Sequence, residues 1–182
     1  MARFGQLVAL VGPSGSGKDT LLAGLARACP DLHVARRTIS RPASAETEPY
    51  ESVIPEQFAA LRADGAFALH WQAHGLFYGI RHRELVPLQD GRVVIFNGSR
   101  RALPGIIAYQ PDVRVITVTV PPDLLAARLA ARGREDADEI AARLKRTDLA
   151  LAGHLTSGVV WNDGTPEEGI ARLVELLQPV NA

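Results

Sequence analysis

Residues 6–20 read QLVALVGPSGSGKDT, and this stretch sets the architecture of the chain. Its first part, Gln6 to Val11, is a continuous apolar run, typical of a strand buried on both faces of a parallel sheet. A glycine-rich turn follows at once, and beyond Lys18 the apolar residues recur at helical spacing as far as Pro30. The sequence therefore predicts a strand, a tight loop and a helix.

The glycine-rich turn has the spacing of a phosphate-binding P-loop and lies where that motif is expected, between strand and helix. Glycines let backbone N–H groups converge on phosphate oxygens, and the start of the helix adds positive potential. We expect Lys18 to reach the β and γ phosphates of ATP and to act in catalysis. A glycine-rich turn without a ligand is the alternative. The residues expected to bind the nucleotide are Gly12, Pro13, Ser14, Gly15, Ser16, Gly17, Lys18, Asp19 and Thr20.

Asp19 departs from the motif, because the residue after the lysine is normally a Ser or Thr whose hydroxyl binds Mg²⁺. Thr20 does not substitute for it, since neighbouring helical residues point ~100° apart. A carboxylate beside a triphosphate would be repulsive without a cation between them. We therefore expect Asp19 to bind Mg²⁺, either directly or through water.

The rest of the chain repeats the alternation of strand and helix. Apolar runs at 93–96, 113–120 and 159–161 each precede a predicted helix. The last helix begins at Thr165 with a capping box that Glu168 completes. This order predicts an α/β fold of the P-loop NTPase type, with a doubly wound parallel sheet.

Two segments interrupt this alternation. Residues 37–89 contain polar stretches and a short predicted hairpin within 67–78, and we interpret them as an acceptor-binding insert. An irregular segment at about 132–140 joins two predicted helices and is a candidate lid. The chain is then a single kinase domain of 182 residues, whose core comprises 1–36 and 90–182.

Composition narrows the class of protein. Twenty basic residues balance twenty acidic ones, so net charge favours neither nucleic acid nor an anionic membrane as a partner. Cys29 is the single cysteine, which excludes an internal disulfide and fits a reducing compartment. Apolar runs fall short of the ~20 residues of a membrane span. We expect a cytoplasmic protein that acts on small molecules.

The order of P-loop, insert and lid resembles the guanylate kinase family. The segment Thr38-Ile-Ser-Arg41 resembles that family's acceptor-phosphate motif, and Phe77-Tyr-Gly79 resembles its Tyr-Tyr-Gly. The segment from Arg128 to Glu135, followed by Arg143, resembles its lid and lid helix. Asn162-Asp163 resembles the loop that borders the adenine of ATP.

This resemblance implies a role for individual residues. Arg128 and Asn162 are expected to bind ATP, and Arg132 and Arg143 to act in catalysis. The residues expected to hold the acceptor are Arg41, Tyr78 and Arg134. Arginine suits these sites because its planar fork binds phosphate oxygens in pairs, although many of the chain's arginines are expected to be solvated surface residues.

Two departures point away from guanylate as the acceptor. Guanylate kinases read guanine with a glutamate before a tryptophan and a serine after Tyr-Tyr-Gly, and here these positions are His70 and Ile80. Polar groups of a base left unpaired in a closed site cost ~1 to 3 kcal/mol each. The sequence therefore favours an acceptor without a guanine.

A narrower resemblance accounts for these departures. Residues 12–19, 76–79 and Asn97-Gly-Ser-Arg100 resemble the ribose 1,5-bisphosphate phosphokinases of phosphonate degradation, which are relatives of guanylate kinase. The resemblance implies that ATP phosphorylates ribose 1,5-bisphosphate to 5-phospho-α-D-ribose 1-diphosphate (PRPP).

The segment Asn97-Gly-Ser-Arg100 carries further expectations. We expect Asn97 and Ser99 to orient acceptor oxygens, Arg100 to bind the acceptor, and Asp19 to supply the charge that Asn97 lacks. A simple turn at Asn97-Gly98 is the alternative.

Two other functions stay open at this stage. One is a guanylate or other nucleoside monophosphate kinase. The other is a non-catalytic, guanylate-kinase-like interaction module, against which the presence of Lys18 and the lid arginines argues.

Overall fold

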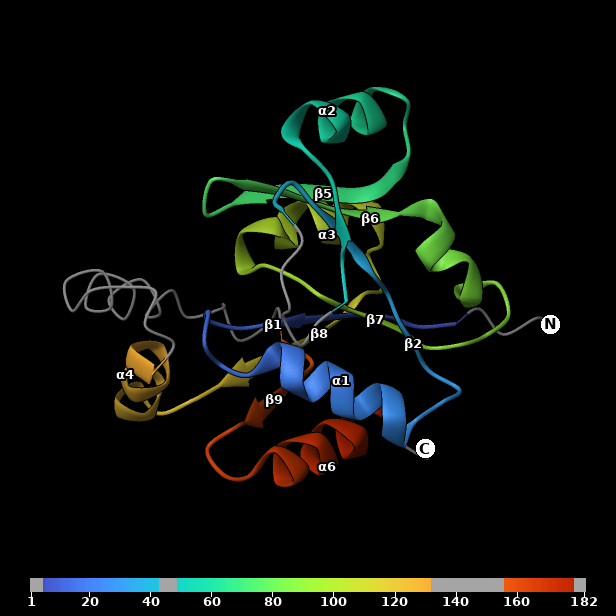
Figure 1. Ribbon diagram of the computed structural model, residues 1–182. Coiled ribbons are helices and arrows are strands. Elements are labelled where there is room, and N and C mark those ends of the chain that lie inside the picture. The colour runs from blue at the N-terminus through green and yellow to red at the C-terminus, as the bar shows by residue number, and fades with distance from the viewer. Residues whose placement is uncertain (1–4, 43–48, 132–155, 179–182) are drawn as a thin grey trace.

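The computed structural model describes residues 5–42, 49–131 and 156–178, which form two β-sheets with helices around them (Figure 1). The main sheet has five strands in the order β2-β7-β1-β8-β9, all of them parallel. Non-consecutive neighbours require crossovers, which is the expected doubly wound α/β topology. Its strands are β1 (Leu7–Val11), β2 (His33–Val34), β7 (Val94–Asn97), β8 (Arg114–Thr119) and β9 (Gly158–Trp161).

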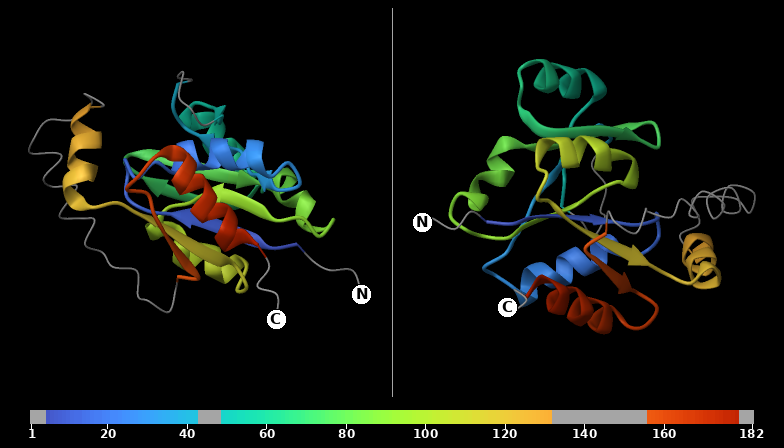
Figure 2. Two further views of the ribbon diagram at one scale, coloured as in Figure 1. Left: turned by 90° about the horizontal axis from the view of Figure 1, so that it is seen from below. Right: turned by 180° about the vertical axis from the view of Figure 1, so that it is seen from behind.

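One face of the main sheet is covered by helices α1 (Lys18–Ala28) and α6 (Pro166–Leu177), which lie beside each other in both views (Figures 1 and 2). Val8 and Leu10 of β1 point to this face and are fully buried. They pack with apolar residues of both helices, among them Leu173. Burial of each such side chain contributes about 1.5–3 kcal/mol, so this core fixes the helix that carries the P-loop.

The opposite face of the main sheet packs against α3 (Leu103–Tyr109) and the second sheet. Leu7, Ala9 and Val11, which alternate with the residues of the first core, lie here at 2% exposure or less. The continuous apolar run of β1 therefore serves two cores, as predicted for a strand that is buried on both faces.

The second sheet has four strands in the order β4-β3-β6-β5 and lies within the range assigned to the insert. Helix α2 (Pro55–Ala63) covers its outer face through Phe58, whose ring stacks on those of Phe67 and Phe77 at centroid distances of 4.6 and 5.5 Å. The predicted hairpin is confirmed, whereas α2 and the other two strands were not predicted. The strands are β3 (Arg37–Ile39), β4 (Glu51–Ser52), β5 (Phe67–Ala73) and β6 (Leu76–Arg81).

The remaining elements complete the connections. A 3₁₀ segment, η1 (His82–Leu88), leads from the second sheet toward β7. The helix predicted near 99–109 is divided into η2 (Arg100–Ala102) and α3, with a proline in the first turn of α3. The predicted helix after β8 is α4 (Pro122–Ala131).

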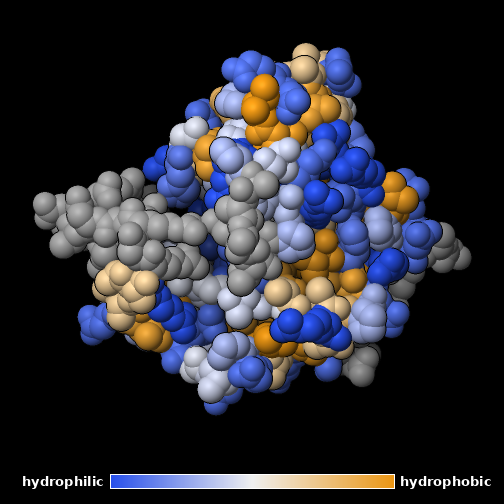
Figure 3. All heavy atoms as spheres, viewed as in Figure 1, coloured by the Kyte–Doolittle hydropathy of each residue, from blue (hydrophilic) through white to orange (hydrophobic). Residues whose placement is uncertain are grey.

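The remaining observations concern the last helix, membrane spans, the surface and the candidate lid. The capping box at Thr165 is confirmed, since its hydroxyl accepts a hydrogen bond from the Glu168 amide. Across the described ranges, no helix is long and apolar enough to cross a membrane. In the face shown in Figure 3, the coloured apolar residues form separate groups among polar ones. The candidate lid at about 132–140, with Arg132 and Arg134, lies outside the described residues, and so does Arg143, which follows it.

Candidate active site

The P-loop joins the carboxyl end of β1 to the first residue of α1. Gly15 and Gly17 both have a φ of 87°, a left-handed conformation that favours glycine. A Cβ at Gly17 would lie 2.4 Å from the side-chain nitrogen of Asn162, so no other residue fits there. The loop therefore places its backbone close to neighbouring side chains at the amino end of a helix, which is the geometry of an anion site.

Lys18 lies inside this loop. Its ammonium group donates hydrogen bonds to the carbonyl oxygens of Gly12 at 3.0 Å and Pro13 at 2.9 Å, and to the hydroxyl of Ser16 at 3.5 Å. Ser16 is completely buried. The positive charge is thus held against the first residues of the P-loop, and in P-loop proteins this lysine contacts the phosphates of the nucleotide.

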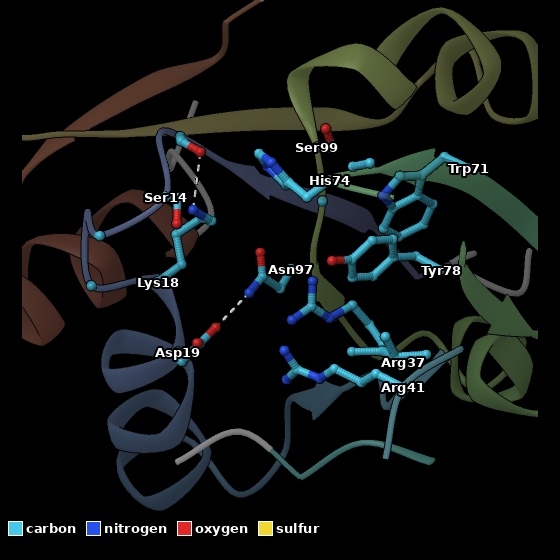
Figure 4. A pocket seen from close by; sticks show the side chains of 16 residues that line it. Ser14, Lys18, Asp19, Arg37, Arg41, Trp71, His74, Tyr78, Asn97 and Ser99 are labelled. Atoms are coloured by element: carbon cyan, nitrogen blue, oxygen red, sulfur yellow. Dashed lines mark hydrogen bonds between the residues drawn. The ribbon is translucent and has the colours of Figure 1, made fainter. Parts of the chain in front are cut away.

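Asp19 and Asn97 are in direct contact at the carboxyl end of β7 in the main sheet. The Asn97 side-chain nitrogen donates a hydrogen bond of 2.6 Å to Asp19 Oδ1 (Figure 4). Asn97 is the last residue of β7 and 4% exposed, so it belongs to the strand, and the alternative of a simple turn is wrong. The contact orients the carboxylate beside the P-loop.

This carboxylate fits a magnesium ion. Mg²⁺ in phosphate-transfer sites takes one or two carboxylates together with phosphate oxygens and waters, and does not need a protein cage. Among the described residues there is no group of three or more His, Cys, Asp or Glu side chains that could hold a metal. The Asp19 carboxylate beside the P-loop fits that role, with Asn97 as its hydrogen-bonded support.

The largest group of predicted site residues lines one cavity between the P-loop and the second sheet (Figure 4). Gly12, Ser14, Lys18 and Asp19 form one side. Residues of three strands form the other side, and Asn97, Gly98 and Ser99 lie between them. The side chains contributed by the strands of the second sheet and by the residues that follow them are those of Arg37, Ile39, Arg41, Trp71, Ala73, His74 and Tyr78.

Arg37 and Arg41 both point into this cavity toward Asp19 and Asn97 (Figure 4). Arg41 was predicted, but Arg37 was not selected from among the many arginines. The signal that identifies it is the spacing of Arg37, Ile39 and Arg41, because alternate residues of a strand share a face. His74 and Trp71 were also missed.

Aromatic rings support both arginines. The guanidinium carbon of Arg37 lies 5.4 Å from the ring centroid of Tyr78, whose ring stacks on Trp71 at 5.6 Å with an interplanar angle of 5°. The guanidinium carbon of Arg41 lies 4.5 Å from the ring centroid of Tyr50. These contacts stabilise cationic groups without using their N–H donors.

A second cavity lies on the other side of the P-loop and shares Gly15 and Gly17 with the first. Its lining includes Thr20, Arg128 and Asn162. The placement of Thr20 here, away from Asp19, agrees with the angle between neighbouring helical residues. The two cavities therefore meet at the P-loop, one toward the second sheet and one toward α4 and α6.

Asn162 and Arg128 give this second cavity the chemistry of a nucleotide site. Asn162 is 6% exposed, and its side-chain nitrogen donates a 2.7 Å hydrogen bond to the carbonyl of Ser16, which braces the loop. The Nη1 atom of Arg128 is buried and has no hydrogen-bond partner in the described structure. A buried guanidinium nitrogen without an acceptor is costly, and an oxygen or nitrogen of bound ATP would satisfy it.

Two predicted acceptor residues, Ser99 and Arg100, lie differently with respect to the first cavity. Ser99 lines the first cavity, and its hydroxyl also accepts a hydrogen bond from the Arg101 amide. Arg100 is partly buried, which lowers the pKa of its guanidinium, and it is not among the described residues that line the cavity.

His70 and Ile80, the two departures from guanylate kinase, are not in the described lining either. Ile80 is fully buried in the core between the two sheets, and His70 is exposed and alternates along β5 with Leu69 and Trp71. A polar group that reads a base is thus replaced by a core residue at position 80.

Comparisons with known proteins agree with this geometry. The chain is 50% identical over 180 residues to the ribose 1,5-bisphosphate phosphokinase PhnN of Ruegeria sp. (strain TM1040), covering 98% of this chain and 94% of the relative. It is 44% identical over 171 residues to a bifunctional ribose 1,5-bisphosphokinase-thymidine phosphorylase of Azorhizobium caulinodans, of which it spans 25%. No protein-family model matches the chain.

Among solved structures, the crystal structure of guanylate kinase from Anaplasma phagocytophilum superposes with a TM-score of 0.72 at 17% identity. The match covers 97% of this chain and 89% of that one, and it shows a guanylate-kinase-like P-loop fold. With its relatives at 42% and 50% identity over nearly their whole length, the chain belongs to the family of ribose 1,5-bisphosphate phosphokinases, PhnN.

Proposed function

We propose that this protein transfers the γ-phosphoryl group of ATP to the 1-phosphate of ribose 1,5-bisphosphate, which yields PRPP and ADP. The observation that carries the proposal is that the P-loop faces two arginines, Arg37 and Arg41, across one shared cavity. A phosphate donor and a phosphate acceptor meet there between positive groups. The PhnN relatives are named as phosphokinases of ribose 1,5-bisphosphate, and this activity transfers a phosphoryl group to that acceptor.

The reaction requires little proton chemistry from the protein. An oxygen of the 1-phosphate forms a bond to the γ phosphorus, the bond from that phosphorus to the β–γ bridging oxygen breaks, and its electron pair leaves with ADP. The nucleophile is already anionic near neutral pH, so no strong general base is needed. Positioning and neutralisation of charge account for catalysis in such reactions.

On the donor side, Lys18 neutralises charge on the β and γ phosphates, and Asn162 and Arg128 hold the nucleotide in the second cavity. Asp19, oriented by Asn97, would hold Mg²⁺. When bound, the ion would supply positive charge that offsets the charge of the phosphates. Pro13, Ser14, Ser16 and the loop glycines complete the cradle.

On the acceptor side, Arg41, Tyr78 and Ser99 face the phosphates from the cavity wall, with Asn97 between the two substrates. Arg100 lies beside this wall, next to Ser99. Arg134 is assigned to the acceptor, and Arg132 and Arg143 to the transferred phosphoryl group, from the lid motif. An ATP-using enzyme with a single cysteine fits a cytoplasmic location.

An acceptor panel tests this function. The purified protein is incubated with ATP and Mg²⁺ and, separately, with ribose 1,5-bisphosphate, ribose 5-phosphate, guanylate and adenylate, and products are identified by phosphorus NMR. We expect PRPP from ribose 1,5-bisphosphate and little turnover of the nucleotides. Efficient guanylate phosphorylation without PRPP formation would refute the proposal and favour a nucleoside monophosphate kinase.

The interaction module makes a different prediction for the same assay. A non-catalytic module gives no product with any acceptor, and its partner binding does not depend on Lys18. Turnover by the unmodified protein, together with its fall of about a thousandfold in a Lys18→Ala variant, excludes that alternative.

A further inference from the structure

We infer that Arg37 is a further catalytic residue, which together with Arg41 clamps the reacting phosphate of the acceptor. The inference rests on the proposed function and specifies how its acceptor is held. Arg41 belongs to the acceptor-phosphate motif, whereas Arg37 lies outside that motif and is assigned here from its place in the cavity.

The strand brings both arginines to one side. Arg37 begins β3, Ile39 ends it, and Arg41 follows two residues later, and all three line the cavity. The backbone of Arg37 is paired with Ile80, which is fully buried. Because the strand is fixed to the core at this point, Arg37 has a defined direction, and Figure 4 shows its side chain reaching toward Asn97.

Charge identifies what the two arginines bind. The guanidinium groups of Arg37 and Arg41 line one cavity, and Lys18 adds a third positive group on the facing wall. A phosphate dianion can accept bidentate hydrogen bonds from both guanidinium groups. The geometry therefore fits a phosphate held between β3 and the P-loop.

The position across from Lys18 selects the reacting phosphate. For the 1-phosphate to attack ATP, two highly negative groups must approach each other, and positive groups beside the attacking oxygen reduce this repulsion. Arg37 and Arg41 point toward Asp19 and Asn97 beside the P-loop (Figure 4). The proposed function places phosphoryl transfer at this point.

The aromatic stack explains how Arg37 stays in place. Its guanidinium carbon lies 5.4 Å from the centroid of Tyr78, and Trp71 backs Tyr78 at 5.6 Å. Trp71 also lies against Phe96 of the core, at a centroid distance of 6.4 Å. The arginine is thus preorganised by a stack that begins in the main sheet, and Trp71 acts as a positioning residue.

The test is an Arg37→Gln variant of the full chain, assayed with ATP, Mg²⁺ and ribose 1,5-bisphosphate. We expect kcat/KM for the acceptor to fall about a hundredfold, mainly through kcat, because a contact made to the transition state is lost. An Arg37→Lys variant should recover part of the activity, since it restores the charge without the fork. The KM for ATP should stay within about twofold of its original value.

Ribose 5-phosphate, which lacks the 1-phosphate, distinguishes the two ends of the acceptor. If Arg37 holds the reacting phosphate, inhibition by ribose 5-phosphate is the same in Arg37→Gln and in the unmodified protein. A parallel loss of this inhibition would show that Arg37 holds the 5-phosphate, and would overturn the assignment. Acceptor kcat/KM within about twofold of the original would overturn it as well.

Arg62→Gln is the matched control, because Arg62 is an exposed residue of α2 in the same insert and its loss removes the same charge. Its kinetics should not change. Failure of the proposed function is seen separately, because the unmodified protein then forms no PRPP. In that case the Arg37 variants are compared on whichever phosphate acceptor the unmodified protein uses.

Discussion

The two walls of the cavity are built in different ways. The P-loop wall comes from one continuous stretch, Gly12 to Asp19, and its binding groups are largely backbone amides at a helix start. The acceptor wall takes single side chains from β3, β5 and β6, far apart in sequence. A backbone site is specified locally, whereas a side-chain site depends on how strands pair. In the proposed function, the first wall sets the type of chemistry and the second selects the acceptor.

The largest expected effect is on the P-loop wall. Lys18→Ala should lower kcat about a thousandfold, because the ammonium group neutralises charge at the transferred phosphoryl group. The dissociation constant of the acceptor should change by less than about twofold, since the second sheet is not touched. Steady-state kinetics and calorimetric titration measure the two quantities.

Arg27→Ala is the control for this change, because Arg27 is an exposed residue in the last turn of the same helix. Its activity should equal that of the unmodified protein. If Lys18→Ala weakened acceptor binding as strongly as it lowers turnover, the P-loop wall and the acceptor wall would not act independently of each other.

A smaller effect is expected for Asp19→Asn, which keeps an oxygen for the hydrogen bond from Asn97 and removes the charge. The Mg²⁺ concentration for half-maximal activity should rise about tenfold to a hundredfold, as for other changes at metal-supporting groups. Titration of activity with Mg²⁺ at saturating ATP measures this. An unchanged Mg²⁺ dependence would show that Asp19 has no link to the metal.

The difference between the two walls also determines how much could be predicted from the sequence. Four of the five strands of the main sheet, the P-loop and the capping box at Thr165 follow from local patterns, and the structure contains each of them. The fifth strand, β2, has two residues and was not predicted. The sequence suggested that Asp19 supplies the charge that Asn97 lacks, but it did not predict the hydrogen bond between the two side chains.

The acceptor wall could be predicted only in part. Strand spacing shows that Arg37 and Arg41 share a face, but only the pairing of β3 with β6 shows that this face lines a cavity. Helix α2 was missed because Phe58 is its one buried residue, so it has no apolar stripe of helical period. Long-range pairing of short strands leaves little trace in a single sequence.

Glu51 tests the rigidity of the acceptor wall. Its carboxylate accepts hydrogen bonds from the Thr38 hydroxyl at 2.8 Å and from two Arg81 nitrogens at 2.7 Å, and thus ties β4 to β3 and β6. Glu51→Gln should reduce the free energy of unfolding by ~1 to 2 kcal/mol and raise the KM for the acceptor more than that for ATP. Urea denaturation and kinetics measure these changes.

The pH dependence of the stability difference between Glu51→Gln and the unmodified protein tests whether the Glu51 charge contributes. Burial alone would raise the pKa of Glu51, but hydrogen bonds from Thr38 and Arg81 and the charges of Arg81 and Arg83 outweigh it, so that the pKa is lowered. A lowered pKa in the folded state means that the stabilisation is present above the unfolded-state pKa and is lost as the pH falls through the folded one. The free energies of unfolding of Glu51→Gln and the unmodified protein should therefore become more similar in acid. A difference that does not change with pH would contradict an ionic contribution of Glu51.

The smallest effect is expected far from the acceptor wall, at the start of α6. Thr165→Ala removes the hydroxyl that accepts from the Glu168 amide and should cost ~1 kcal/mol, or a melting temperature about 2 to 4 °C lower. Thr165→Ser keeps the hydroxyl and should cost much less. Acceptor kinetics should stay unchanged in both, because α6 packs on α1 and not on the second sheet. If the two variants lost equal stability, the cap would contribute nothing; if acceptor KM rose with them, the two walls would be coupled through the core.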